Sequence, residues 1–236
     1  MKWTDHEAAL FDLDGVLTPT ADIHMAAWSA MFNDFLASRG IEEPFTDADY
    51  YACIDGRPRY EGVATFLASR GIELPEGDPS DEPGAETIAG LGNRKNDFFI
   101  KALDSEGIDA YPGAISLVEK LADLGIPMAV VSSSRNAAPV LAEAGLTDWF
   151  EMVVDGVVAE RENLAGKPDP ACFLYAAEVL GIDPADAVVV EDALSGVEAG
   201  AAGGFGMVVG IDRGAGADEL LAAGADLVVE DCGELL

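Results

Sequence analysis

The chain of 236 residues predicts an α/β protein with a doubly wound parallel sheet and an inserted α-helical cap domain. Apolar runs of strand length recur along it, and most are continuously apolar, as in strands covered on both faces. Helical patterns separate these runs, several of them ending in glycine. Strands that alternate with helices form parallel sheets with right-handed crossovers. A third observation predicts the cap, because no strong strand pattern occurs between residues 20 and 111.

The order of the elements defines two domains. The expected strands are residues 8–12, 127–131, 151–155, 187–191, 206–210 and 226–230. The helical patterns between them are residues 115–125, 136–145, 170–181, 194–204 and 217–224. We therefore assign residues 1–19 and 111–236 to the core and residues 20–110 to the cap, whose helical stretches are residues 24–40, 60–71 and 85–107. Ligands of open α/β sheets lie at the carboxyl ends of the strands, so we expect the cap to cover the first strand's end.

Composition restricts the partners and the compartment. A net charge of −31, from 44 acidic and 13 basic residues, argues against binding to nucleic acid or to an anionic membrane. The apolar runs are shorter than the ~20 residues that span a bilayer, and the first residues show no signal-peptide pattern. Cys53, Cys172 and Cys232 lack the spacing of a metal site. We expect a cytoplasmic monomer whose acidic surface resembles that of salt-adapted proteins.

The first strand ends in a pair of carboxylates, Asp12 and Asp14. Side chains alternate along a strand, so both project to the same side while Leu13 points away. Two ionised carboxylates this close repel each other unless a cation or a shared proton compensates them. An acidic turn after a strand is the alternative interpretation.

Polar residues follow three further strands. Ser132 to Asn136 precede a helix, where hydroxyls and backbone N–H groups bind anions, although a serine-rich helix cap is equally compatible with the pattern. Lys167 follows the third strand in the segment AGKPDP, where two prolines fix the local backbone. The alternative interpretation is a solvated surface charge, as for most lysines. Glu191 and Asp192 end the fourth strand, and their hard oxygen ligands suit Mg²⁺.

The order and spacing of these motifs resemble the haloacid dehalogenase superfamily of phosphotransferases over nearly the whole chain. The cap, its insertion point and the continuation DGVLTPTADIHMAAW resemble the β-phosphoglucomutase branch. The resemblance implies a Rossmann-like core in which Asp12 is the nucleophile, forming an aspartyl phosphate, and Asp14 the general acid and base. It implies that Ser132 and Lys167 bind the transferred phosphoryl group. It also implies a Mg²⁺ site built from Asp12, the Asp14 carbonyl, Glu191 and Asp192.

The resemblance extends to a sugar phosphate bound at both ends. Thr20, His24 and Trp28 match the branch, which implies that His24 orients Asp14 or relays a proton. Cap residues for the substrate would be Lys95 and Arg59, with Arg57 competing for the distal phosphate, which arginine binds in bidentate fashion. The core side of that phosphate site would comprise Ser133, Ser134, Arg135 and Asn136. Pro19, Arg135 and the long loop 74–84 depart from the branch pattern, so the sugar stays open.

Two functions share the core motifs. The leading one interconverts β-glucose 1-phosphate and glucose 6-phosphate through a bisphosphate; the other is a phosphatase, in which water discharges the aspartyl phosphate. A phosphorylatable signalling module, from a different class, is disfavoured by the cap and by Asp14. A metal-free dehalogenase is also disfavoured, because Asp14, Glu191 and Asp192 would have no metal to bind. A phosphonate hydrolase would need a Schiff-base lysine in the cap, where Lys95 has a better explanation.

Overall fold

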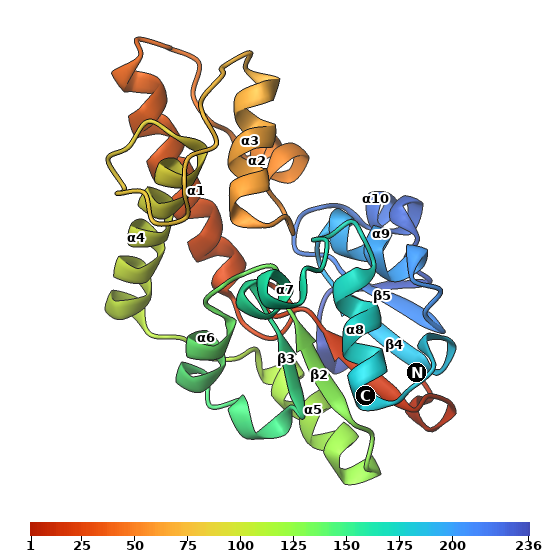
Figure 1. Ribbon diagram of the computed structural model, residues 1–236. Coiled ribbons are helices and arrows are strands. Elements are labelled where there is room, and N and C mark those ends of the chain that lie inside the picture. Colours follow the sequence, from red (N-terminus) through yellow and green to blue (C-terminus); the bar gives the residue numbers. More distant parts are fainter. The chain divides into compact units, whose positions relative to one another are not determined.

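The computed structural model describes the backbone of residues 1–236 and all side chains except those of residues 104–106. The chain forms two compact units (Figure 1). The core unit comprises residues 1–19 and 108–236, and the helical unit comprises residues 20–107.

In the core unit, six strands of the described chain form one parallel sheet with the order β3-β2-β1-β4-β5-β6. The strands are β1 (Ala8–Phe11), β2 (Met128–Val131), β3 (Met152–Val154), β4 (Ala187–Glu191), β5 (Met207–Ile211) and β6 (Leu227–Val229). The first strand lies in the middle of the sheet, between β2 and β4, and all of its residues are buried. The predicted parallel sheet is thus confirmed, and the carboxyl end of β1 lies where strand order reverses, the position at which such sheets bind ligands.

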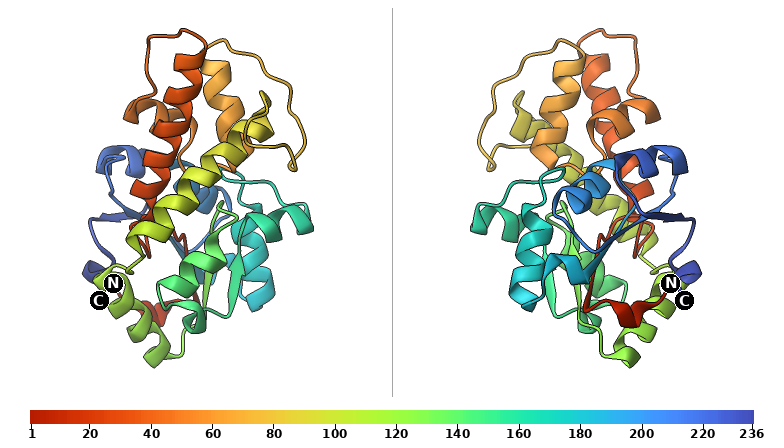
Figure 2. Two further views of the ribbon diagram at one scale, coloured as in Figure 1. Left: turned by 90° about the vertical axis from the view of Figure 1, so that its left-hand side faces the viewer. Right: turned by 90° about the vertical axis from the view of Figure 1, so that its right-hand side faces the viewer.

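Helices cover both faces of the sheet. They are α5 (Pro112–Leu124), α6 (Ala137–Glu143), α7 (Gly156–Glu162), α8 (Ala171–Leu180), α9 (Leu194–Ala202) and α10 (Ala217–Ala223). One hydrophobic core joins α8, α9 and α10 to alternate residues of the strands, such as Leu10 of β1 and Val189 of β4. Figure 2 shows α5 and α8 on opposite sides of the sheet. Short 3₁₀ turns comprise Trp3–Asp5, Thr147–Trp149, Pro184–Asp186 and Cys232–Leu235.

The helical unit has a hydrophobic core of its own. It comprises α1 (Thr20–Ser38), α2 (Asp47–Cys53), α3 (Arg59–Ser69) and α4 (Ile88–Glu106). Trp28, Phe32 and Phe35, which the sequence places on one face of a helix, are all buried. Phe32 of α1 packs against Phe66 of α3 with ring centroids 4.2 Å apart. Aromatic side chains bury a large area each, so this cluster accounts for much of the unit's packing.

Two helices were not predicted from the sequence. The first, α2, is only seven residues long but begins with a capping box in which Thr46 and Asp49 bond each other's backbone N–H. The second, α7, is N-capped by Asp155, whose carboxylate accepts hydrogen bonds from Val157 and Val158. Both helices are too short for a 3.6-residue period of apolar residues to be recognised. For α2, the Thr46–Asp49 spacing of the capping box was the available signal.

Candidate active site

The end of β1 places Asp12 deep in the core unit and turns the chain immediately after Asp14. The Asp12 N–H donates to the Val190 carbonyl of β4 at 2.9 Å, so the aspartate continues the sheet register. Gly15 follows with φ of +89°, a backbone conformation that favours glycine. A Cβ at Gly15 would also overlap the carboxylate of Asp192. The glycine of the FDLDG motif therefore permits both the turn and the close approach of the next acidic residue.

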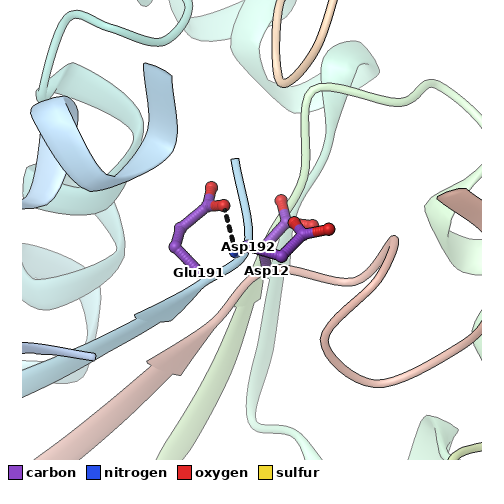
Figure 3. Close-up of side chains that lie close together, drawn as sticks. All are labelled: Asp12, Glu191 and Asp192. Atoms are coloured by element: carbon purple, nitrogen blue, oxygen red, sulfur yellow. Dashed lines mark hydrogen bonds between the residues drawn. The ribbon is translucent and has the colours of Figure 1, made fainter. Parts of the chain in front are cut away.

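Three buried carboxylates meet at this point: Asp12, Glu191 and Asp192. Pairing of β1 with β4 sets Phe11 opposite Val190, which brings the residues that follow each strand side by side. One oxygen from each carboxylate lies within 4.8 Å of the others (Figure 3). Glu191 Oε2 also accepts hydrogen bonds from the backbone N–H groups of Asp192, at 2.9 Å, and Ala193, at 3.0 Å. The sheet register therefore builds the acidic cluster that the motifs predicted.

Lys167 is buried against two of these carboxylates. Its Nζ lies 2.5 Å from both Asp12 Oδ1 and Glu191 Oε1, and it donates to the Val131 carbonyl at 3.0 Å. The ammonium also lies 5.0 Å from the centre of the Phe173 ring. Burial by itself lowers the pKa of a lysine, but the charges of Asp12 and Glu191 outweigh it and raise the pKa of Lys167 above its usual value. Lys167 is therefore a permanent cation beside Asp12, not a surface charge.

The charge balance of the cluster fits a divalent cation. Burial raises the pKa of Asp12 well above its usual value; Lys167 opposes this effect, and Glu191 and Asp14 add to it. The Lys167 ammonium compensates one of the three carboxylates, and a doubly charged ion would compensate the others. Carboxylate oxygens are also the ligands that Mg²⁺ prefers. The donor set and its charge thus both suit Mg²⁺.

The serine-rich turn after β2 lies beside Asp14. Ser132 Oγ donates to Asp14 Oδ2 at 3.3 Å and accepts from the Ser134 N–H at 3.1 Å. Ser134 Oγ in turn accepts from the Asn136 N–H at 3.1 Å. Neither serine is the N-cap of α6, which is Asn136 and makes no side-chain cap bond. The geometry therefore does not support the helix-cap alternative, and it brings a predicted phosphoryl-binding hydroxyl to the predicted acid and base.

The other polar residues of this turn lie farther along it. Arg135 forms an exposed ion pair with Glu160 of α7, with Nη1 2.6 Å from Oε2. A Cβ on Gly156, the first residue of α7, would overlap the Arg135 side chain, so the arginine packs closely on that helix. Ser133 and Asn136 are both partly exposed. These residues lie in one partly exposed turn of the core unit.

In the helical unit, α1 and α4 bring His24 and Lys95 together. Lys95 is only 3% exposed, and its Nζ contacts His24 Nδ1. The ammonium lies 5.1 Å from the Trp28 ring centre and 4.8 Å from that of Phe99, and Phe99 also stacks on His24 at 3.9 Å. Thr20, the first residue of α1, lies one turn before His24 and is buried. The predicted cap residues Thr20, His24 and Lys95 thus come from neighbouring helix faces.

Arg59 begins α3 and is oriented by a residue that was not predicted. Its Nη2 donates to Asn96 Oδ1 at 2.7 Å. Arg57, the competing candidate, lies two residues earlier in the turn before the helix. Asn96 directly follows Lys95, and Phe99 lies four residues after Lys95 on the same helix face. That spacing was a signal by which Phe99 could have been found, whereas Asn96 pairs with Arg59 across two helices and had no local signal.

Within the residues that the structure describes, none of the helices is both long and apolar enough to cross a bilayer.

Comparison with known proteins gives a consistent set of relatives. A family model described as haloacid dehalogenase-like hydrolase matches residues 6–204. A β-phosphoglucomutase of Mycobacterium tuberculosis is 50% identical over 97% of this chain and 91% of its own length. Hexitol phosphatase A of Escherichia coli is 33% identical over 83% of this chain and 78% of its own. Among solved structures, a β-phosphoglucomutase from Clostridium difficile has a TM-score of 0.78 at 26% identity, covering 98% of this chain and 93% of that one.

Proposed function

The chain belongs to the haloacid dehalogenase-like hydrolase family, and we propose that it interconverts β-glucose 1-phosphate and glucose 6-phosphate by phosphoryl transfer through Asp12. Membership of this family and the 50% identity to a β-phosphoglucomutase indicate that the chain is an enzyme, either a mutase or a phosphatase. The observation that carries the proposal is the contact of Lys167 with Asp12 at 2.5 Å, inside a buried cluster of carboxylates. A buried carboxylate held beside a fixed cation is placed to attack an electrophile that itself carries negative charge.

In the first half of the reaction, an Asp12 carboxylate oxygen attacks phosphorus. The new O–P bond forms as the bond from phosphorus to the sugar oxygen breaks, giving an aspartyl phosphate and a sugar alkoxide that takes a proton from Asp14. Ser132 and Lys167 would bind the oxygens of the transferring group, which requires in-line positioning and charge neutralisation more than covalent help. In the second half, a hydroxyl of a sugar monophosphate attacks the phosphoryl group and Asp14 takes the hydroxyl proton. The bond from phosphorus to Asp12 breaks as the new O–P bond forms, which gives a sugar bisphosphate and frees the Asp12 carboxylate.

A magnesium ion fits the acidic cluster at the end of β1. We propose that Asp12, Glu191, Asp192 and the backbone carbonyl of Asp14 hold it. When bound, the ion neutralises charge on the phosphoryl oxygens during transfer. Lys167 would share this task, since its ammonium contacts the Asp12 carboxylate directly.

The helical unit would supply the sugar end of the site as a cap. We propose that Arg59, aimed by Asn96, binds the distal phosphate together with Ser133, Ser134, Arg135 and Asn136. We propose that His24, in contact with Lys95, orients Asp14 or relays its proton, and that Thr20 contributes to substrate binding. The substrate is then a small sugar phosphate held at both ends.

The cysteines Cys53, Cys172 and Cys232 are free and buried, as a reducing compartment permits, and we propose a cytoplasmic monomer.

A phosphatase is the second candidate, favoured by the 33% identity to hexitol phosphatase A. Both candidates share the aspartyl phosphate and differ in whether a sugar hydroxyl or water discharges it. Phosphorus NMR separates them, with Mg²⁺, β-glucose 1-phosphate and a trace of glucose 1,6-bisphosphate added to the protein, and a sample with chelator as control. Glucose 6-phosphate identifies the mutase, and free phosphate alone identifies the phosphatase. Conversion of neither kind would contradict both.

A further inference from the structure

The loop after Asp14 is held by three separate parts of the core unit. Three consecutive carbonyls accept one hydrogen bond each: Gly15 from Arg213 Nε at 2.8 Å, Val16 from Cys232 Sγ at 3.7 Å, and Leu17 from the Tyr111 N–H at 2.9 Å. The loop also closes on itself, because the N–H groups of Leu17 and Thr18 both donate to the Leu13 carbonyl. Because the loop makes hydrogen bonds both within itself and to other segments of the core unit, its backbone has little freedom to move.

Arg213 contacts Tyr111 and Glu230 in addition to the Gly15 carbonyl. Its guanidinium lies 4.0 Å from the centre of the Tyr111 ring, and Nη1 donates to the Glu230 carbonyl at 3.0 Å. Tyr111 lies three residues beyond Ile108, where the chain re-enters the core unit, and Gly15 lies four residues before the chain leaves it at Pro19. One side chain, 25% exposed, therefore connects the outgoing and the returning segments. Arg213 also lies beyond residue 204, where the match to the family model ends.

We propose that Arg213 is a positioning residue that holds Asp14 in its working orientation and anchors both connections to the helical unit. Gly15 directly follows Asp14, so fixing the Gly15 carbonyl limits how far the neighbouring peptide, which carries the Asp14 carbonyl, can move with its side chain. Gly15 lies so close to the Asp192 carboxylate that even a methyl group would overlap it, so movement toward Asp192 is blocked. Arg213 restrains the carbonyl of the same residue through its hydrogen bond. The part of this inference that concerns catalysis rests on the proposed function.

A guanidinium suits this position better than an ammonium. The planar group stacks on Tyr111 while its Nε and Nη1 donate in different directions, to Gly15 and to Glu230. A lysine could reach one carbonyl but could not stack flat on the ring and serve both acceptors. We therefore expect Arg213→Lys to keep the fold and loosen the loop, and Arg213→Ala to loosen it further.

The first test measures the loop and needs no activity. Hydrogen exchange of the peptide that contains residues 13–18 should be at least about tenfold faster in Arg213→Lys than in the wild type, the loss expected for one charged hydrogen bond. Peptides of β4 should exchange at the wild-type rate, which excludes general destabilisation. The control is Arg161→Lys, since Arg161 is a surface arginine of α7 that pairs with its neighbour Glu162. Unchanged exchange at residues 13–18 in both Arg213 variants would overturn the inference.

The second test measures catalysis with a small aryl phosphate and Mg²⁺. We expect kcat to fall about 10- to 100-fold in Arg213→Ala with KM little changed, and millimolar guanidinium ions to restore part of kcat. A loss that guanidinium does not relieve, in a variant whose loop exchanges normally, refutes the positioning role. If the wild type itself transfers no phosphoryl group, the proposed function fails, while the exchange measurement still decides whether Arg213 holds the loop. Should Arg213→Ala not fold, Arg213→Lys answers both questions.

Discussion

Replacement of Lys167 by methionine should separate the two sources of positive charge at the acidic cluster. Methionine keeps most of the length and the apolar stem that packs near Phe173, but removes the ammonium that lies 2.5 Å from both Asp12 and Glu191. Loss of one partner of a buried ion pair destabilises proteins by about 3–5 kcal/mol, because the other charge stays buried. With Lys167 almost fully buried and two carboxylates left behind, we expect the free energy of unfolding in chelator to fall by that amount.

Magnesium should reduce this loss. The ion and the ammonium compensate the same carboxylates, so the variant should bind Mg²⁺ more tightly than the wild type and gain more stability from it. At a free Mg²⁺ concentration 100 times Kd, binding to the folded state contributes about 2.7 kcal/mol. Phosphoryl transfer should nevertheless stay at least about 100-fold below wild type, because the metal does not replace the ammonium on the phosphoryl oxygens.

The assay is urea unfolding in chelator and in Mg²⁺, at one constant ionic strength because the chain carries a net charge of −31. Unfolding is monitored by amide hydrogen exchange of peptides from β1 and β4, because these strands report on the core unit and not on the helical unit. Lys101→Met is the matched control, since Lys101 is an exposed lysine of α4 and its loss should change stability by less than about 0.5 kcal/mol. Wild-type stability of Lys167→Met in chelator, or an equal Mg²⁺ effect on both proteins, would refute the charge argument.

Two further substitutions test the site, and added salt tests the acidic surface. Asp12→Asn should lower turnover at least ~1,000-fold while circular dichroism shows an intact fold; retained turnover would remove Asp12 as nucleophile. Arg59→Ala should weaken binding of a phosphosugar about 10- to 100-fold and leave hydrolysis of an aryl phosphate nearly unchanged. Arg57→Ala tests the competing candidate and should have the smaller effect on phosphosugar binding; equal losses on both substrates in Arg59→Ala would place Arg59 outside the distal site. Added salt should raise the melting temperature by screening the acidic surface; a flat response between low and molar salt would argue against salt adaptation.

Much of the core unit could be read from local patterns. Continuous apolar runs predicted each strand to within about two residues, because strands covered on both faces need apolar side chains at every position. Glycine after a helix marked most C-termini, as at Gly125 and Gly181, which adopt the left-handed conformation. Short helices escaped detection, since α2 and α7 are stabilised by side-chain caps more than by a long apolar face.

The contacts inside the site were only partly predictable. The motifs indicated that Asp12, Lys167 and Glu191 would meet, because parallel strands end at one edge of the sheet. They did not indicate that the ammonium bridges both carboxylates, since this depends on where the AGKPDP loop lies in space. The pairing of Arg59 with Asn96 arises from packing between α3 and α4, two helices separated by a long loop.

The sequence by itself determined the parallel sheet and the inserted helices, and it predicted which carboxylates, hydroxyl and lysine follow the ends of the strands. These depend on residue type and on short-range spacing, which the linear chain contains in full. Only the tertiary structure decided that Lys95 lies between aromatic rings against His24, and that Arg213 holds the loop after Asp14 from 198 residues away. Such contacts depend on the packing of distant segments, and a single charged residue in a loop shows no periodicity from which its partner could be inferred.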